Sequence, residues 1–203
     1  MSHGELRDRD VRNALKAKVL SEHITDPNTL VLDELGLQHG ASRVDIAVIN
    51  GFIHGYEIKS DADTLDRLPT QILIYGSVLD RATLVVSEKH VEKASRMLPE
   101  WWGIRLVKVG PRGGIEFPTA RSHGKNLEFD PIAMAGLLWR PEVVEILRTL
   151  GVSESLLRQP RAVLYRILAE TVQPNTLRKL VTQRLKAREG WRGRTPLSTG
   201  ACS

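Results

Sequence analysis

Two apolar runs on either side of an Asn-Gly dipeptide constrain the fold of this chain more than any other feature. Residues 43–49 and 52–59 are each typical of a strand, and Asn50-Gly51 between them is a strong signal for a hairpin turn. Apolar residues occupy both alternating positions of the two runs, whereas a strand with one solvated face alternates apolar and polar residues. We therefore expect a sheet that other elements cover on both faces.

The spacing of apolar residues in the neighbouring segments predicts helices and further strands around this hairpin. A first helix is expected to end near Ser21, before the break at Asp26-Pro27. Helical spacing returns over residues 63–80, where Pro69 either kinks the helix or marks its true start. The other expected elements are strands at 29–37, 82–86 and 104–109 and a helix at 89–98. The resulting order, α-β-β-β-α-β-α-β, indicates a compact α/β core with a mixed central sheet flanked by helices.

The composition changes after this core. Residues 112–130 are rich in Gly, Pro, Ser and Asn, which is typical of a linker or surface loop. Four helices are expected after it, at 141–150, 153–158, 161–171 and from Pro174 or Asn175 to about Glu189. The predicted division is a core at 1–110, a linker at 111–130, a basic helical subdomain at 131–190 and a disordered tail at 191–203.

The basic charge of the chain is concentrated near its C-terminus. The chain holds 29 Lys and Arg and 24 Asp and Glu, of which residues 140–194 hold 12 and 5, so this segment carries +7 and the rest −2. Such a segregated charge suggests a surface that binds a polyanion, although a solvated helical face explains it equally well.

The rest of the composition excludes several classes of protein. The single cysteine, Cys202, excludes a disulfide framework and a cysteine-rich zinc site, and the six histidines lack the spacing of zinc ligands. No run approaches the ~20 apolar residues that cross a bilayer, and the N-terminus lacks the apolar centre of a secretory signal. We therefore expect a cytoplasmic protein with no membrane partner.

Three ionisable residues on the two hairpin strands form the candidate site. Glu57 and Lys59 point to the same face of their strand, because side chains alternate. A two-residue turn would place Asp45 opposite Tyr56 and facing away from Glu57. A three-residue loop with a left-handed Gly51, or a bulge near Gly55, would bring Asp45 to the same side as Glu57. We predict one of these irregularities.

Two carboxylates and a lysine that converge in this way suit phosphodiester hydrolysis. The carboxylates of Asp45 and Glu57, with the backbone carbonyl of Ile58, would offer Mg²⁺ the hard oxygen ligands it prefers, and Mn²⁺ would substitute. Lys59 would orient the metal-bound water or stabilise charge on the phosphorus. An isolated Glu-x-Lys is common on solvated strands, but the apolar surroundings here strengthen the signal.

This pattern resembles the PD-(D/E)xK nuclease superfamily, in which Asp lies on the second strand and Glu-x-Lys on the third. The chain is most similar to a small branch from bacteria and their phages that is related to MmcB-type predicted repair endonucleases. Three further features carry the resemblance: Glu34 in LDELGLQHGASRVD, the run GYEIKSDADTLDRL, and Gln71 with Tyr75 in QILIY. The resemblance covers residues 5–109 well and implies a restriction-endonuclease-like α/β core with a C-terminal helical appendage.

The resemblance also implies roles for residues around the carboxylates. Gln71 and Tyr75, four residues apart on one helical face, would lie at the active site, with Gln71 positioning water or phosphate. Core packing with a satisfied hydroxyl explains Tyr75 equally well. Glu34 would complete the acidic set as a metal ligand or outer acceptor. Many relatives place that glutamate on the first helix, where Glu5 and Glu22 are candidates.

Four further residues flank the proposed site. Arg43 and Arg67 are expected to contact phosphates or to pair with Asp61 or Asp66. Asp61 and Asp63 could bind a second metal, but Asp63 is better suited to cap the following helix.

The leading hypothesis is a Mg²⁺-dependent DNA endonuclease whose basic helical segment holds the duplex backbone. Cutting both strands requires two active sites, which leaves a homodimer open, although no coiled-coil pattern supports one. The alternative is a catalytically inactive nucleic-acid-binding or regulatory module on the same fold, and a third hypothesis is a protein whose basic segment docks on an acidic partner. The predicted DNA-binding residues of the segment are Arg158, Arg161, Arg178, Lys179, Arg184, Lys186 and Arg188.

Overall fold

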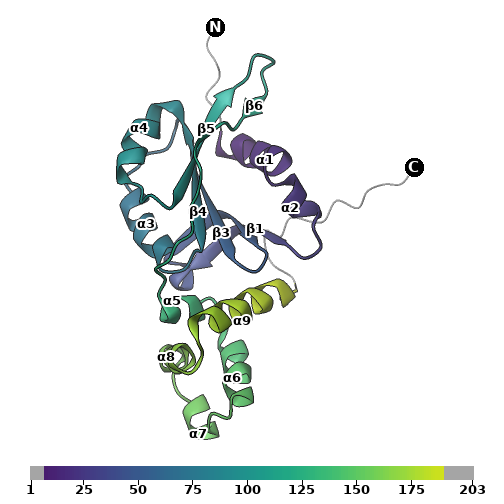
Figure 1. Cartoon of the computed structure of the whole chain (residues 1–203), viewed down its shortest axis with the longest axis vertical. Coiled ribbons are helices and arrows are strands. Elements are labelled where there is room, and N and C mark those ends of the chain that lie inside the picture. The colour runs from purple at the N-terminus through teal and green to yellow at the C-terminus, as the bar shows by residue number, and fades with distance from the viewer. Residues whose placement is uncertain (1–6, 190–203) are drawn as a thin grey trace, which may run out of the picture.

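A mixed sheet of seven strands forms the centre of the part of the chain that the computed structural model describes, residues 7–189 (Figure 1). The strand order is β1-β2-β3-β4-β5-β6, and β7 also pairs with β5. The β1-β2 and β2-β3 pairs are antiparallel, β3-β4 and β4-β5 are parallel, and β6 and β7 run antiparallel to β5. The strands are β1 (Leu30–Leu37), β2 (Ser42–Ile49), β3 (Ile53–Lys59), β4 (Arg81–Ser87), β5 (Trp102–Val109), β6 (Ile115–Glu116) and β7 (Thr119–Arg121).

Helices cover both faces of the sheet, so the expected mixed α/β fold is confirmed. The pair α3 (Leu68–Gly76) and α4 (Glu88–Met97) lies on one face, and α1 (Asp8–Lys18) with α2 (Ser21–Thr25) lies on the other (Figure 1). Apolar side chains form a separate cluster on each face. The central strand β3 is buried along its whole length, which agrees with the apolar residues at both of its alternating positions.

The loop between β2 and β3 has three residues, which is one of the two irregularities that the sequence predicted. Ile49 pairs with Ile53 and Ile46 with Tyr56, so the same register places Asp45 opposite Glu57. Gly51 has a φ of 104°, a conformation that glycine adopts without a steric penalty.

Two segments differ from the predicted elements in an informative way. The helix expected at 63–80 begins at Leu68, so Pro69 lies in the first turn and marks its start. Part of the expected loop at 112–130 joins the sheet, because β6 and β7 pair with the edge of β5. Strands of two and three residues are too short to produce a periodic pattern, so this part of the linker prediction is wrong.

A group of helices follows the sheet and packs against one of its edges (Figure 1). The apolar cluster under α3 continues without interruption into these helices, so the segment shares the core of the sheet. The short helix α5, five residues long, was not expected as a separate element. The helices are α5 (Pro131–Ala135), α6 (Arg140–Thr149), α7 (Glu154–Leu157), α8 (Arg161–Thr171) and α9 (Pro174–Ala187).

A buried ion pair connects α9 to the sheet. Arg178 pairs with Asp80, whose side chain is 3% exposed, and the guanidinium also lies 4.3 Å from the ring centroid of Phe129. The other carboxylate oxygen of Asp80 accepts the backbone N–H of Ile53 at 2.8 Å. Asp80 therefore joins the start of β3 to the C-terminal helices.

We predict that Arg178→Met destabilises the protein by ~3 kcal/mol, because it leaves the Asp80 carboxylate buried without its cation. The neighbouring Lys179 is exposed, so Lys179→Met serves as the matched control and should change the free energy of unfolding by less than ~0.5 kcal/mol. Urea denaturation of both variants measures the difference. Equal stability of the two variants would show that the ion pair does not hold the helices to the sheet.

Candidate functional site

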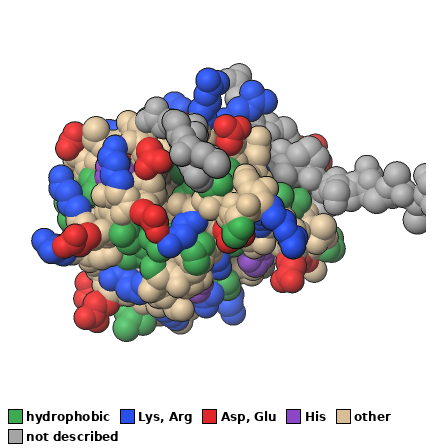
Figure 2. Space-filling view, turned by 90° about the horizontal axis from the view of Figure 1, so that it is seen from above, with side chains coloured by type: hydrophobic (Ala, Val, Ile, Leu, Met, Phe, Trp, Pro, Cys, Tyr) green, Lys and Arg blue, Asp and Glu red, His purple; other side chains and the backbone are tan. Residues whose placement is uncertain are grey.

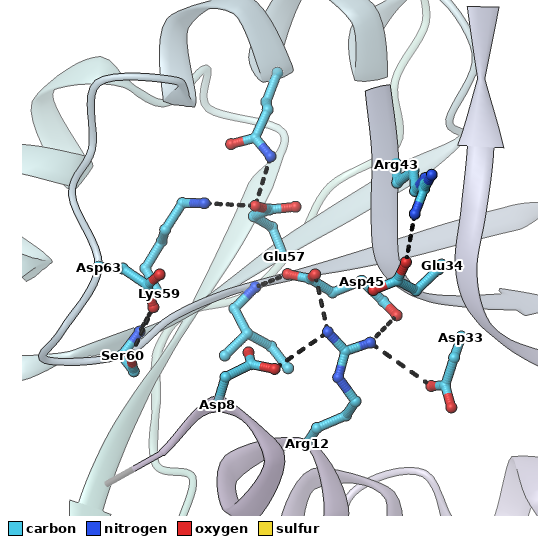
Figure 3. Close-up of polar contacts among 12 residues, drawn as sticks. Asp8, Arg12, Asp33, Glu34, Arg43, Asp45, Glu57, Lys59, Ser60 and Asp63 are labelled. Atoms are coloured by element: carbon cyan, nitrogen blue, oxygen red, sulfur yellow. Dashed lines mark hydrogen bonds and ion pairs between the residues drawn. The ribbon is translucent and has the colours of Figure 1, made fainter. Parts of the chain in front are cut away.

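A polar cleft of about 590 Å³ lies where β2, β3, α1 and α3 meet, and it contains most of the residues predicted for the site (Figure 3). Carboxylates, cations and an amide approach one another inside it, whereas two arginines lie at its exposed rim. The predicted residues that line it are Glu34, Arg43, Asp45, Glu57, Ile58, Lys59, Asp63, Arg67 and Gln71.

The carboxylate of Glu57 is the most buried charge in this cleft. Only 2% of the residue is exposed, and both carboxylate oxygens accept hydrogen bonds. Oε1 accepts from Nζ of Lys59 at 2.7 Å and from Nε2 of Gln71 at 2.6 Å. Oε2 lies 2.5 Å from the hydroxyl of Tyr75. Such a set of donors compensates for much of the cost of burying the charge.

Tyr75 contacts Glu57 and also packs in the core. Its hydroxyl lies between Oε2 of Glu57 and the backbone carbonyl oxygen of Arg43, 2.6 Å away. Its ring is fully buried and lies parallel to Trp102, with the centroids 5.7 Å apart. Burial and the charge of Glu57 raise the pKa of Tyr75, so the hydroxyl stays protonated. The expected placement of Gln71 and Tyr75 on one face of α3 is confirmed.

Asp45 lies beside Glu57 but has different partners (Figure 3). Its Oδ2 accepts the backbone N–H of Ile58 at 2.7 Å, and its Oδ1 accepts from Nη2 of Arg12 at 3.0 Å. The other amino group of Arg12 donates to the backbone oxygen of Asp45 at 2.6 Å. Burial and the charge of Glu57 raise the pKa of Asp45 to about 7. The charge of Glu57 therefore favours the protonated form of Asp45.

Arg12 is the main residue of the site that sequence reasoning missed. It extends from α1 and pairs with Asp8 at 3.3 Å and with Asp33 at 3.9 Å, in addition to Asp45. Lys16, one turn further along α1, pairs with the same Asp33. The four-residue spacing of Asp8, Arg12 and Lys16 is visible in the sequence, but an ordinary solvated helix face has the same spacing.

Glu34 and Arg43 lie at the exposed side of the cleft. Their side chains pair at 3.0 Å and are 52% and 66% exposed, so this ion pair contributes little to stability. Glu34 has a φ of 58°, and the β1-β2 register lacks a pair between it and Asp45. At Glu34 the regular alternation of side chains between the two faces of the sheet is therefore interrupted.

The remaining predicted acidic residues have other roles or positions. The side chain of Asp63 accepts the backbone N–H of Ser60 at 2.8 Å and does not cap α3, which begins five residues later. Glu22 lies in α2 and is exposed, away from the cleft. Glu5 and the tail at 191–203 lie outside the described residues.

The arrangement does not fit the predicted Mg²⁺ site. Within residues 7–189, no group of three or more His, Cys, Asp and Glu side chains could hold a metal ion. The oxygens of Asp45 and Glu57 accept hydrogen bonds from Arg12, Lys59 and neighbouring donors, and Ile58 contributes its N–H to Asp45. Binding of Mg²⁺ or Mn²⁺ stays a prediction from the sequence.

Several basic residues predicted to contact DNA form internal contacts instead. Arg184 pairs with Glu145 at 2.9 Å, and Arg188, 8% exposed, pairs with Glu142 at 2.6 Å. Arg178 holds Asp80, as described above, and Nζ of Lys186 donates to the backbone oxygen of Asn28 at 3.2 Å. The exposed basic side chains of the predicted set in the C-terminal segment are Arg158, Arg161 and Lys179.

Comparison with known proteins identifies relatives over almost the whole length. The model of the family described as Bacteriophage P4 protein cII matches residues 1–193. Protein cII of enterobacteria phage P4 is 24% identical over 183 residues, which cover 90% of this chain and 68% of that protein. A solved protein of unknown function from Silicibacter pomeroyi is 19% identical and covers 66% of this chain and 88% of its own, with a TM-score of 0.39.

These matches overturn the leading functional hypothesis. The family that covers residues 1–193 is that of phage P4 protein cII, so the predicted metal-dependent endonuclease, with its nuclease and hydrolase character, is wrong, and its metal-binding character has no support from the family. The expected connection with phages agrees with the family. The resemblance to the PD-(D/E)xK superfamily stays a prediction.

We predict that Lys59→Met destabilises the protein by ~3 kcal/mol, because Glu57 then keeps a buried charge without its cation. Adding Glu57→Gln in the same chain should recover at least half of that loss, because the charge is removed as well. Lys93→Met on the exposed side of α4 is the matched control. Urea denaturation measures all three, and a double variant less stable than Lys59→Met alone would contradict this account of the cluster.

A second prediction concerns the pH dependence of stability. Because folding raises the pKa of Asp45 from 3.8 to about 7, the folded state binds more protons than the unfolded state between these values. The stability of the wild type relative to Asp45→Asn should therefore fall by ~3 kcal/mol as the pH rises from about 4.5 to 7.5. Urea denaturation in EDTA measures this difference, and a constant or rising difference would refute it.

Proposed function

We propose a function for this protein from its membership of the bacteriophage P4 protein cII family, to which the chain belongs: it is a regulatory module that binds DNA through phosphate contacts and does not cut it. The sequence analysis gave such a module as the alternative to a nuclease. We further propose that it acts in the cytoplasm. None of the helices within residues 7–189 is long and apolar enough to cross a membrane.

Exposed arginines along two adjoining hollows carry this proposal. The first hollow is the polar cleft, and the second is a groove of about 330 Å³ between the sheet and the C-terminal helices, which we call the aromatic groove. Gly40 lines both, so the two hollows adjoin. Arg67 lies at the first, where Arg43 is paired with Glu34, and Arg140 and Arg161 line the second. A phosphate backbone that follows this path would meet a guanidinium group at each hollow.

The distribution of ion pairs supports the same surface. In the helices after the sheet, carboxylates pair with Arg148, Arg178, Arg184 and Arg188, which removes these cations from binding. At the opposite end of the molecule, Figure 2 shows acidic and basic side chains intermixed wherever grey atoms do not cover the surface. Exposed basic residues that form no ion pair within residues 140–189 are Arg140, Arg158, Arg161, Arg166 and Lys179.

The internal contacts of the carboxylates favour binding without cleavage. Hydrolysis by this type of site requires carboxylate oxygens that hold a metal and its water. In the cleft, donors from Arg12, Lys59, Gln71 and Tyr75 occupy those oxygens. The cluster thus serves as a support that keeps the strands and α3 in place beneath the arginines.

We predict that the protein binds a labelled DNA duplex with an affinity that falls steeply between 50 and 200 mM salt, by roughly ten-fold or more, as expected for several phosphate contacts. Arg140→Gln with Arg161→Gln should weaken binding at least about five-fold and flatten the salt dependence. Fluorescence anisotropy measures both.

The matched control for this experiment is Lys93→Gln with Arg96→Gln, two exposed cations on α4 away from the path. Incubation of plasmid with the protein and Mg²⁺ or Mn²⁺ should leave the DNA intact. The absence of binding at low salt, or an equal loss in the control variant, would contradict the proposal.

A further inference from the structure

The aromatic groove combines flat rings with cations in a way that phosphate binding alone does not require. It lies between the 3₁₀ turn η1 (Gln38–Gly40) and the C-terminal helices. Trp139, Tyr165 and His39 line it together with Arg140 and Arg161. Its volume of about 330 Å³ is near the lower limit of ligand pockets, which range from roughly 300 to 1,000 Å³. The groove therefore suits one small planar group rather than a duplex.

Trp139 is a fixed ring on this surface, although 57% of it is exposed to solvent. Its backbone N–H donates to Oε2 of Glu142 at 2.6 Å, which sets the start of α6. The guanidinium of Arg188 lies 4.2 Å from the centroid of the indole. Arg188 is itself held by Glu142 and by the backbone oxygen of Leu137, 2.8 Å away. The protein therefore holds one face of the indole in place but leaves more than half of the residue exposed to solvent.

The opposite wall of the groove contains an unusual backbone. Gln38, His39 and Gly40 have φ values of 46°, 59° and 92°, and such values cost energy for residues other than glycine. This conformation places the exposed imidazole of His39 over Tyr165, with the ring centroids 5.7 Å apart and the planes 19° from parallel. Tyr165 in turn donates to the backbone oxygen of Leu138 at 2.9 Å. The strained turn therefore completes an aromatic wall.

Two guanidinium groups lie beside the rings. Arg140 donates from Nη2 to the backbone oxygen of Leu157 at 3.1 Å, which orients it at the groove. Arg161 is exposed at the first turn of α8. Neither takes part in an ion pair found within residues 7–189, so an incoming anion displaces no carboxylate from them.

We propose that the aromatic groove binds an unpaired nucleotide of single-stranded DNA, with its base stacked on Trp139 and its phosphates in contact with Arg140 and Arg161. This inference rests on the proposed function and adds its preferred substrate form. Stacking of a base on an aromatic side chain contributes about 1 to 3 kcal/mol, and a base inside a duplex cannot reach the indole without leaving its own stack. The protein should therefore bind single strands more tightly than duplexes of the same sequence.

The experiment compares a labelled single strand of mixed sequence with the duplex formed by adding its complement. Trp139→Leu removes the ring but keeps an apolar side chain, and Trp139→Phe keeps a ring. We expect Trp139→Leu to weaken binding of the single strand about ten-fold and to leave duplex binding within about two-fold of the wild type. Trp139→Phe should retain most of the affinity.

Tryptophan fluorescence gives an independent readout on the same samples. Titration with the single strand should quench the emission of the wild type, and the quenching should be largely absent from Trp139→Phe, which keeps the other tryptophans. Thermal denaturation of each variant confirms that it is folded before its affinity is interpreted.

The outcomes separate this inference from the proposed function. If neither form of DNA binds, the proposed function fails. If both bind equally and Trp139→Leu changes neither, the groove does not hold a base, while phosphate binding stands. If an oligoglutamate peptide binds and depends on Trp139 whereas single-stranded DNA does not, the groove is a protein-docking site and the inference is overturned.

Discussion

The buried carboxylate of Glu57 determines how the core of this protein is assembled. A charge inside a sheet that is covered on both faces is costly unless donors surround it. One donor, Lys59, comes from the same strand, and the other two, Gln71 and Tyr75, come from successive turns of α3. Because Tyr75 also contacts the backbone of Arg43 in β2, compensation of one charge orients α3 across the neighbouring strands.

The same contacts explain how residues of a catalytic type can form a structural cluster. Carboxylates and a lysine at this spacing are equally able to bind a metal or to neutralise one another. A second set of contacts is centred on Arg12, which extends from α1 and holds Asp45. It joins the helix on the opposite face of the sheet to the strand beside Glu57. Helices on both faces are therefore tied to the two hairpin strands by polar contacts.

The basic residues of the C-terminal helices divide into two groups with different consequences. Arg178, Arg184 and Arg188 pair with carboxylates and hold the helices to one another and to the sheet. Arg140 and Arg161 remain beside an exposed groove with a strained turn and a solvent-exposed indole. Net charge alone does not distinguish these groups, since an arginine counts equally whether it crosslinks the fold or meets a ligand.

The sequence by itself determined the features that depend on near neighbours: the order of the core elements, an irregularity in the β2-β3 hairpin, a kink or helix start at Pro69 and the shared face of Gln71 and Tyr75. Each follows from side-chain periodicity or turn geometry within a few residues. Only the tertiary structure decided that Arg12 holds Asp45, 33 residues away, that β6 and β7 extend the sheet, and that His39, Trp139 and Tyr165 share a groove. Such contacts depend on which surfaces the packing brings together. A local sequence pattern does not indicate which distant residue it will contact.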